Sequence, residues 1–101
     1  MTQHHSLITM LHQLLKEMDV VQSQGAGYYT CAPFAKRFNK LMLKAQVLFP
    51  DTGDLMDTFE SLKEEDPKDP ADKSKVLLEI RIEVGQLIAL LESTQQKEPK
   101  V

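Results

Sequence analysis

Several residue types are scarce in this sequence. It has no tryptophan, a single cysteine and only four glycines among 101 residues. One cysteine excludes a disulfide within the chain and a zinc site built from several thiolates. A lone cysteine also favours a reducing compartment, so we expect a cytoplasmic protein. Four glycines and five prolines provide few of the tight turns that an all-β fold requires.

Long apolar runs are absent as well. No stretch approaches the roughly 18 consecutive apolar residues of a membrane-spanning helix, and the first residues lack the basic region of a signal peptide. We therefore expect no membrane segment and no targeting segment. The net charge of −3 argues against binding nucleic acid by overall charge. The charge is unevenly divided, since residues 1–49 carry +3, residues 50–72 carry −7 and residues 73–101 carry +1.

Apolar side chains instead recur at spacings of three and four, which is the period of an amphipathic helix. Four segments have this pattern, at about residues 6–24, 31–49, 51–63 and 69–93. Gly25 and Gly27 follow the first segment and Pro50 stops the second. Asp69 and Pro70 form a strong start signal for the fourth, as an N-cap and a first helical residue. The first helix takes Ser6 as its N-cap or begins as early as Thr2.

We predict an all-α fold, a small up-and-down helical bundle of three long helices and one short helix. The bundle domain spans residues 1–93, and the polar residues 94–101 form a disordered tail. Residues 64–69 are expected to be a charged linker with nothing to bury. The predicted core is Leu7, Leu11, Leu14, Met18 and Val21; Phe34, Phe38, Leu41, Ala45 and Leu48; Leu55, Phe59 and Leu62; and Leu77, Ile80, Val84, Leu87 and Leu91.

The residues that commonly perform catalysis do not form a complete set. His5 and His12 are seven residues apart, but two histidines do not close a zinc site. Cys31 has no histidine in its own turn to act as a base, so we expect a structural cysteine. We predict no catalytic residues, no metal site and no cofactor.

The acidic residues allow one comparison with a catalytic family. All-α nucleoside triphosphate pyrophosphatases pair a Glu-Glu stretch with a later Glu-x-x-Asp that holds Mg²⁺. Here Glu64 and Glu65 are followed by Glu79, but Ile82 stands where the aspartate is needed. A metal-dependent nucleotide hydrolase is therefore the weakest of the functional alternatives.

A basic stripe lies on the second predicted helix. Lys36, Arg37, Lys40 and Lys44 fall within an arc of about 100° at the helical period. Such a stripe, with Tyr28 and Tyr29 just upstream, is one way to bind nucleic acid or another polyanion. It is also typical of the solvated side of an amphipathic helix, and the acidic residues 51–72 are an internal partner.

The fourth predicted helix has a second apolar stripe, which consists of Leu78, Ile82, Gly85 and Ala89. A surface helix needs only one apolar face, so this stripe must be covered by a second copy or by the rest of the bundle. We expect a non-catalytic protein that acts through protein–protein contact as a homodimer. The alternative is a binder of nucleic acid through the basic stripe.

Overall fold

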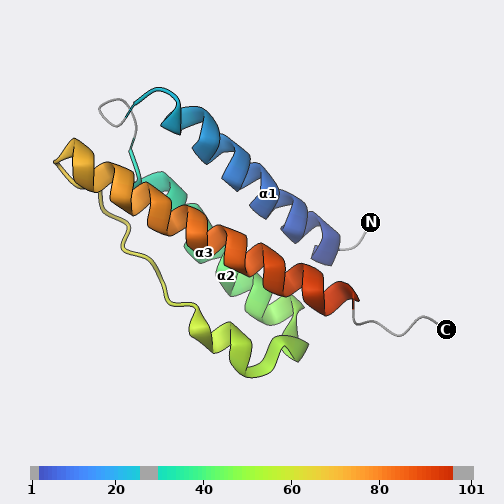
Figure 1. Ribbon diagram of the computed structural model, residues 1–101. Coiled ribbons are helices and arrows are strands. Elements are labelled where there is room, and N and C mark those ends of the chain that lie inside the picture. Colours follow the sequence, from blue (N-terminus) through green and yellow to red (C-terminus); the bar gives the residue numbers. More distant parts are fainter. Residues whose placement is uncertain (1–2, 26–29, 97–101) are drawn as a thin grey trace.

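A computed structural model describes residues 3–25 and 30–96 of the chain. Within these residues the elements are α1 (Gln3–Gln22), α2 (Ala32–Leu48), the 3₁₀ helix η1 (Pro50–Thr58) and α3 (Pro70–Gln96). The three α-helices lie side by side, and each contacts the other two (Figure 1). The predicted all-α bundle of three long helices and one short helix is thereby confirmed.

α1 and α2 run in opposite directions (Figure 1). After α1 the chain turns back into α2. η1 and the residues that follow it then return to the end of the bundle at which α2 begins. α3 then runs in the same direction as α2 and antiparallel to α1. Side-chain contacts agree with this register, because His12 lies 3.0 Å from Glu92 while Gln22, ten residues later, contacts Arg81.

The ends of the helices follow from local chemistry. Asp69 caps α3 as predicted, since its Oδ1 accepts a hydrogen bond of 2.9 Å from the Ala71 backbone amide. Gly25 follows α1 with φ of 92°, a left-handed conformation that favours glycine after a helix. α1 begins at Gln3, so Ser6 is inside the helix and is not its cap.

The core contains most of the predicted apolar residues. Every predicted core residue of α3 is buried, as are Leu7, Leu11, Leu14 and Met18 of α1. In α2, Phe38, Leu41 and Ala45 are buried, whereas Phe34 and Leu48 are half-buried at the edge, as is Val21 of α1. Ile8 and Met56, which flank the predicted core positions, are buried as well, and the pattern missed Ala35, Met42, Phe49 and Ile88.

The third segment is not the α-helix that the sequence predicts over residues 51–63. It is a 3₁₀ helix that ends at Thr58, followed by a chain without helical structure up to residue 69. Leu55, expected in the core, is 57% exposed, and Met56 is buried instead. The reason lies in the backbone of Leu62, whose amide and carbonyl both bond to the side chain of Asn39. An α-helix running through residue 62 would use those groups for its own hydrogen bonds.

Residues 64–69 bury almost nothing, as expected of a linker, because all of them are exposed except half-buried Pro67, but Glu64 and Asp66 form hydrogen bonds with α2 and its start. The side chain of Asn39 on α2 is buried and bonds to the returning chain twice, because it donates to the Leu62 carbonyl at 2.8 Å and accepts from the Leu62 amide at 2.8 Å. Asn39 also donates to Glu64 at 3.0 Å. Farther along, Asp66 accepts hydrogen bonds from the backbone amides of Cys31 and Ala32. An acid of the returning segment therefore caps α2, whose own N-cap residue, Cys31, provides no side-chain hydrogen bond.

The C-terminal end of α3 differs slightly from the expected boundary. The helix runs to Gln96, three residues beyond the predicted limit of the domain at residue 93. Thr94, assigned to the tail, continues the helix, and its hydroxyl donates to the Leu90 carbonyl at 3.0 Å. The rest of the predicted disordered tail, residues 97–101, lies outside the described residues.

Replacing Phe38 by alanine tests the core. Phe38 is 0% exposed, so Phe38→Ala removes a large side chain from a closed space and should lower the free energy of unfolding by about 3–5 kcal/mol. Urea unfolding followed by circular dichroism measures the change. Leu43→Ala is the matched control on the same helix, because Leu43 is 58% exposed and its loss should change stability by less than about 0.5 kcal/mol. Equal effects of the two variants would contradict the assignment of this core.

The contacts of the returning segment are tested by Asn39→Ala and Asp66→Ala. The first leaves the backbone groups of Leu62 without partners and should cost about 1–3 kcal/mol. The second removes a helix cap and should cost about 1 kcal/mol. Glu65→Ala is the control, because Glu65 is exposed between these contacts. A loss of stability in the control as large as in the other two would show that these hydrogen bonds do not stabilise the fold.

Candidate functional site

The predicted basic stripe is an exposed face of α2. Lys36, Arg37, Lys40 and Lys44 are all exposed, and none of them forms an ion pair with a residue that the structure describes. The acidic segment does not neutralise this face. It runs along the side of α2 where Asn39 holds it, and Asn39 lies about 160° around the helix from Arg37 and about 140° from Lys44, but only about 60° from Lys36. Tyr28 and Tyr29 lie outside the described residues.

The basic face borders an apolar groove that the sequence pattern did not indicate. The groove has a volume of about 730 Å³ and runs between the first half of α1 and the second half of α2. Its apolar residues include Met10, Leu43 and Val47, which are 46%, 58% and 75% exposed. Its cations are Arg37, Lys40 and Lys44, whereas Lys36 does not line it. The lining residues are Gln3, Ser6, Leu7, Met10, Arg37, Lys40, Leu41, Leu43, Lys44, Val47 and Leu48.

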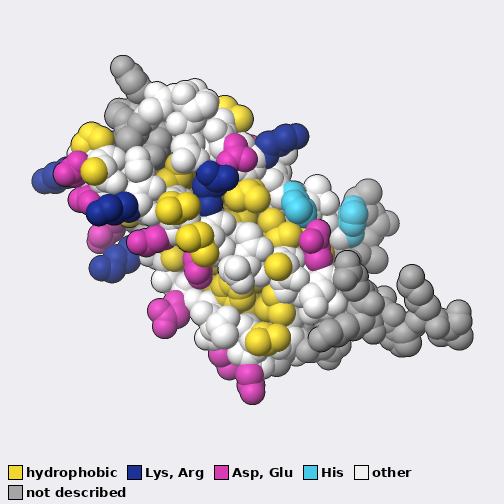
Figure 2. Space-filling model, viewed as in Figure 1, with side chains coloured by type: hydrophobic (Ala, Val, Ile, Leu, Met, Phe, Trp, Pro, Cys, Tyr) yellow, Lys and Arg dark blue, Asp and Glu magenta, His cyan; other side chains and the backbone are white. Residues whose placement is uncertain are grey.

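The second apolar stripe of α3 faces away from the core. Leu78 is 54% exposed and Ile82 is 51% exposed. Ala89 is exposed, Gly85 is half-buried, and no atom lies within 4 Å of the position that a Cβ on Gly85 would occupy. Figure 2 shows the face formed by α1 and α3, on which apolar side chains gather along the middle and acidic side chains along the edge formed by the returning segment. The described residues of the bundle therefore leave this stripe largely uncovered.

Two contacts between α1 and α3 fix which side of α3 faces solvent. Arg81 forms an ion pair of 2.7 Å with Asp19 and donates a hydrogen bond to Gln22. Nearer the C-terminal end of α3, the side chains of His12 and Glu92 lie 3.0 Å apart. Both contacts lie on the edge of α3 between its buried face and the stripe. They hold α1 against that edge and leave the stripe outside.

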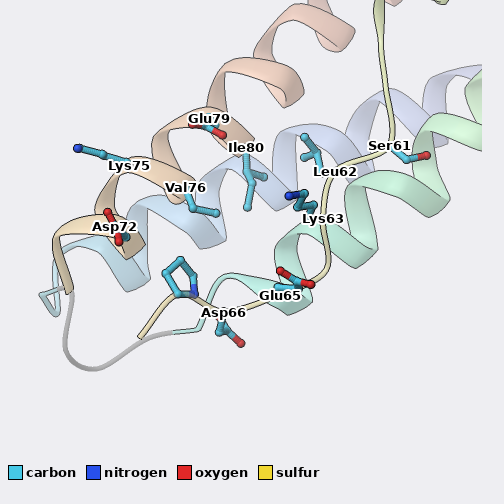
Figure 3. A pocket seen from close by; sticks show the side chains of 11 residues that line it. Ser61, Leu62, Lys63, Glu65, Asp66, Asp72, Lys75, Val76, Glu79 and Ile80 are labelled. Carbon is cyan, nitrogen blue, oxygen red and sulfur yellow. The ribbon is translucent and has the colours of Figure 1, made fainter. Parts of the chain in front are cut away.

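A cleft of about 650 Å³ separates the returning segment from the first half of α3 (Figure 3). Val76 and Ile80 extend from α3 toward this segment, and Glu65 and Glu79 belong to the two different walls (Figure 3). Glu64 is engaged by Asn39 instead. Among the described residues, no group of three histidine, cysteine or acidic side chains is placed to hold a metal ion.

Cys31 lies immediately before α2 and is completely buried. Its thiol donates to the Lys73 carbonyl at 3.4 Å. Burial raises the pKa of the thiol, Asp66 raises this pKa further, and Lys73 partly opposes both effects. A buried thiol that stays protonated is a poor nucleophile. The structure therefore places Cys31 in the core.

The histidines are dispersed on α1. His4 packs edge-on against the ring of Phe49, with ring centroids 4.7 Å apart. His12 pairs with Glu92, and His5 is exposed.

Comparison with known proteins leaves the chain without an identified relative. No protein family, no curated protein and no solved structure matches it. In the part of the chain that the structure describes, no helix combines the length and the apolar character needed to cross a bilayer.

The environment of Cys31 makes a prediction about pH. The thiol pKa is raised in the fold above its ordinary value of 9.0, so the protonated thiol favours the native state. This contribution is complete below pH 9 and is lost as the pH rises through the higher pKa of the native thiol, because unfolding then releases a proton. Urea unfolding should show a fall in stability over that alkaline range. The fall should be smaller in Cys31→Ala, and identical pH profiles of the two proteins would contradict the prediction.

Proposed function

We propose that this protein is a non-catalytic interaction protein that forms a homodimer through the exposed stripe of α3. The observation that carries the proposal is Gly85 in the middle of a 27-residue helix, with open space beside it and exposed Leu78 and Ile82 next to it. Glycine costs a helix about 1 kcal/mol relative to alanine. No contact within the described chain compensates for this cost, whereas a close approach of a second helix would.

The order of residues in the stripe also suits pairing with itself. Its two large residues, Leu78 and Ile82, come first, and its two small residues, Gly85 and Ala89, come last. When two copies of α3 pack antiparallel about a two-fold axis near residue 84, Ile82 lies at the level of Gly85 of the second copy. Leu78 then lies at the level of Ala89 of the second copy. Each large side chain thus meets a small one, which is the complementarity that an isologous interface requires.

The solvent exposure of the stripe adds a physical reason for association. Contiguous apolar patches are unusual on monomeric proteins, because the free energy falls when such a patch is removed from contact with water by association. α3 is about 40 Å long, so the helix offers ample length for contact with a second copy.

The dimer is tested with light scattering on the parent protein and on Ile82→Glu. We expect the parent to have a mass near twice 11.5 kDa at micromolar concentration. Ile82→Glu should halve that mass, because two like charges would be brought together in a dry interface. Leu55→Glu is the matched control, since Leu55 is 57% exposed on η1 and its replacement should leave the dimer intact. A parent mass near 11.5 kDa would overturn the proposal.

Gly85→Leu provides a second variant whose fold should be unaffected. The open space beside Gly85 accepts a side chain within one copy, and leucine favours the helix more than glycine does. In the dimer the same side chain would collide with the second α3. We expect a folded monomer with an unchanged helical spectrum, and a Gly85→Leu variant that still dimerises would contradict the interface.

A further inference from the structure

We propose that the groove between α1 and α2 binds an amphipathic helix of another protein, with acidic residues beside the apolar face of that helix. The groove lies on a different part of the molecule from the stripe of α3, and none of its lining residues comes from α3. The inference is therefore independent of the proposed dimer.

The charge of the groove indicates the chemistry of its occupant. Arg37, Lys40 and Lys44 line it, and no acidic residue does. Glu17 of α1 lines an adjoining depression, which shares Met10, Arg37 and Leu41 with the groove, and it accepts a hydrogen bond from Gln13. None of the three cations has an ion-pair partner among the described residues. Carboxylates of a bound partner are thus the groups that would form ion pairs with these three cations.

The apolar residues of the groove favour a protein helix over a nucleic acid. Val47 and Leu43 are 75% and 58% exposed beside the cations, and Met10 faces them from α1 with 46% exposed. A phosphate backbone bound to the cations would lie against these apolar side chains, and removing charged phosphates from water beside apolar groups costs free energy. An amphipathic helix covers them with its own apolar residues and places its acids against the lysines.

The dimensions of the groove suit a short helix. The residues of α2 that line it run from Arg37 to Leu48, which corresponds to about 16 Å of helix. A partner helix of about three turns spans that length. Packed there, it would add a helix to the bundle at the junction of α1 and α2.

The acidic segment of the same chain is not available to fill the groove. It is held on another side of α2, where Leu62 bonds to Asn39, and at the start of α2, where Asp66 caps the helix. This segment therefore does not occupy the groove of its own molecule.

Fluorescence anisotropy with a labelled synthetic peptide tests the proposal. The probe is a helical peptide of about 14 residues with leucines at i, i+3 and i+7 spacing and glutamates on both sides of them. We expect saturable binding to the parent protein that weakens as salt is added. The same peptide with lysines in place of the glutamates should bind at least about tenfold more weakly. Failure of the acidic peptide to bind, or equal binding of both peptides, would overturn the proposal.

Variants locate the site and distinguish it from a polyanion site. Val47→Asp and Lys44→Glu should each weaken peptide binding at least about fivefold, because both residues line the groove. Lys36→Glu and Leu55→Asp are the matched controls, since they make the same kinds of change at exposed positions outside the groove and should leave binding within about twofold. Equal losses in variants and controls would overturn the assignment of the site.

A labelled single-stranded oligonucleotide is the competing probe. If the oligonucleotide binds more tightly than the acidic peptide and Lys36→Glu weakens it as much as Lys44→Glu does, the whole basic face is a polyanion site and the proposal is wrong. We expect instead that the oligonucleotide binds weakly and does not displace the peptide.

Discussion

The direction of α3 constrains the rest of the structure. Because α3 runs parallel to α2, the chain must return along the length of α2 before α3 begins. An extended segment makes that return with few residues, but its backbone amides and carbonyls then need partners outside a helix. Asn39 provides them for Leu62, and Asp66 in turn satisfies the free amides at the start of α2. The return therefore depends on two contacts between a side chain and backbone groups, one from Asn39 to Leu62 and one from Asp66 to the start of α2.

The position of this segment determines which surfaces stay open. It occupies the side of α2 near Asn39, so the acidic part of the chain faces away from Arg37, Lys40 and Lys44 and leaves them unpaired. It lies along the side of α3 that has Val76 and Ile80 and borders a smaller depression that Ile82 also lines, while α1 contacts α3 through Arg81. The outer stripe of α3 and the groove between α1 and α2 are two apolar surfaces that the described residues leave exposed.

The sequence predicted those features that depend on neighbouring residues. The three long helices, the cap at Asp69 and the buried residues of α3 follow from helical spacing and local start signals, and they are confirmed. The third segment was predicted wrongly, because Leu55, Phe59 and Leu62 have helical spacing, whereas the backbone of Leu62 bonds to the distant side chain of Asn39. The cap at Asp66 joins residues more than thirty positions apart, and no local pattern encodes it. The basic residues were found, but the groove beside them arises only when α1 packs on α2.

The two open surfaces differ in a way that separates their proposed roles. The stripe of α3 has large and small residues in a self-complementary order and no cation of its own, which suits an identical surface. The groove has three unpaired cations and no acid, so a second groove brought against it would repel it. Like charges on one surface disfavour self-association and favour a partner of opposite charge. A protein with both surfaces would form a dimer that presents two basic grooves. A partner with two acidic helices would bind such a dimer more tightly than it binds a single groove.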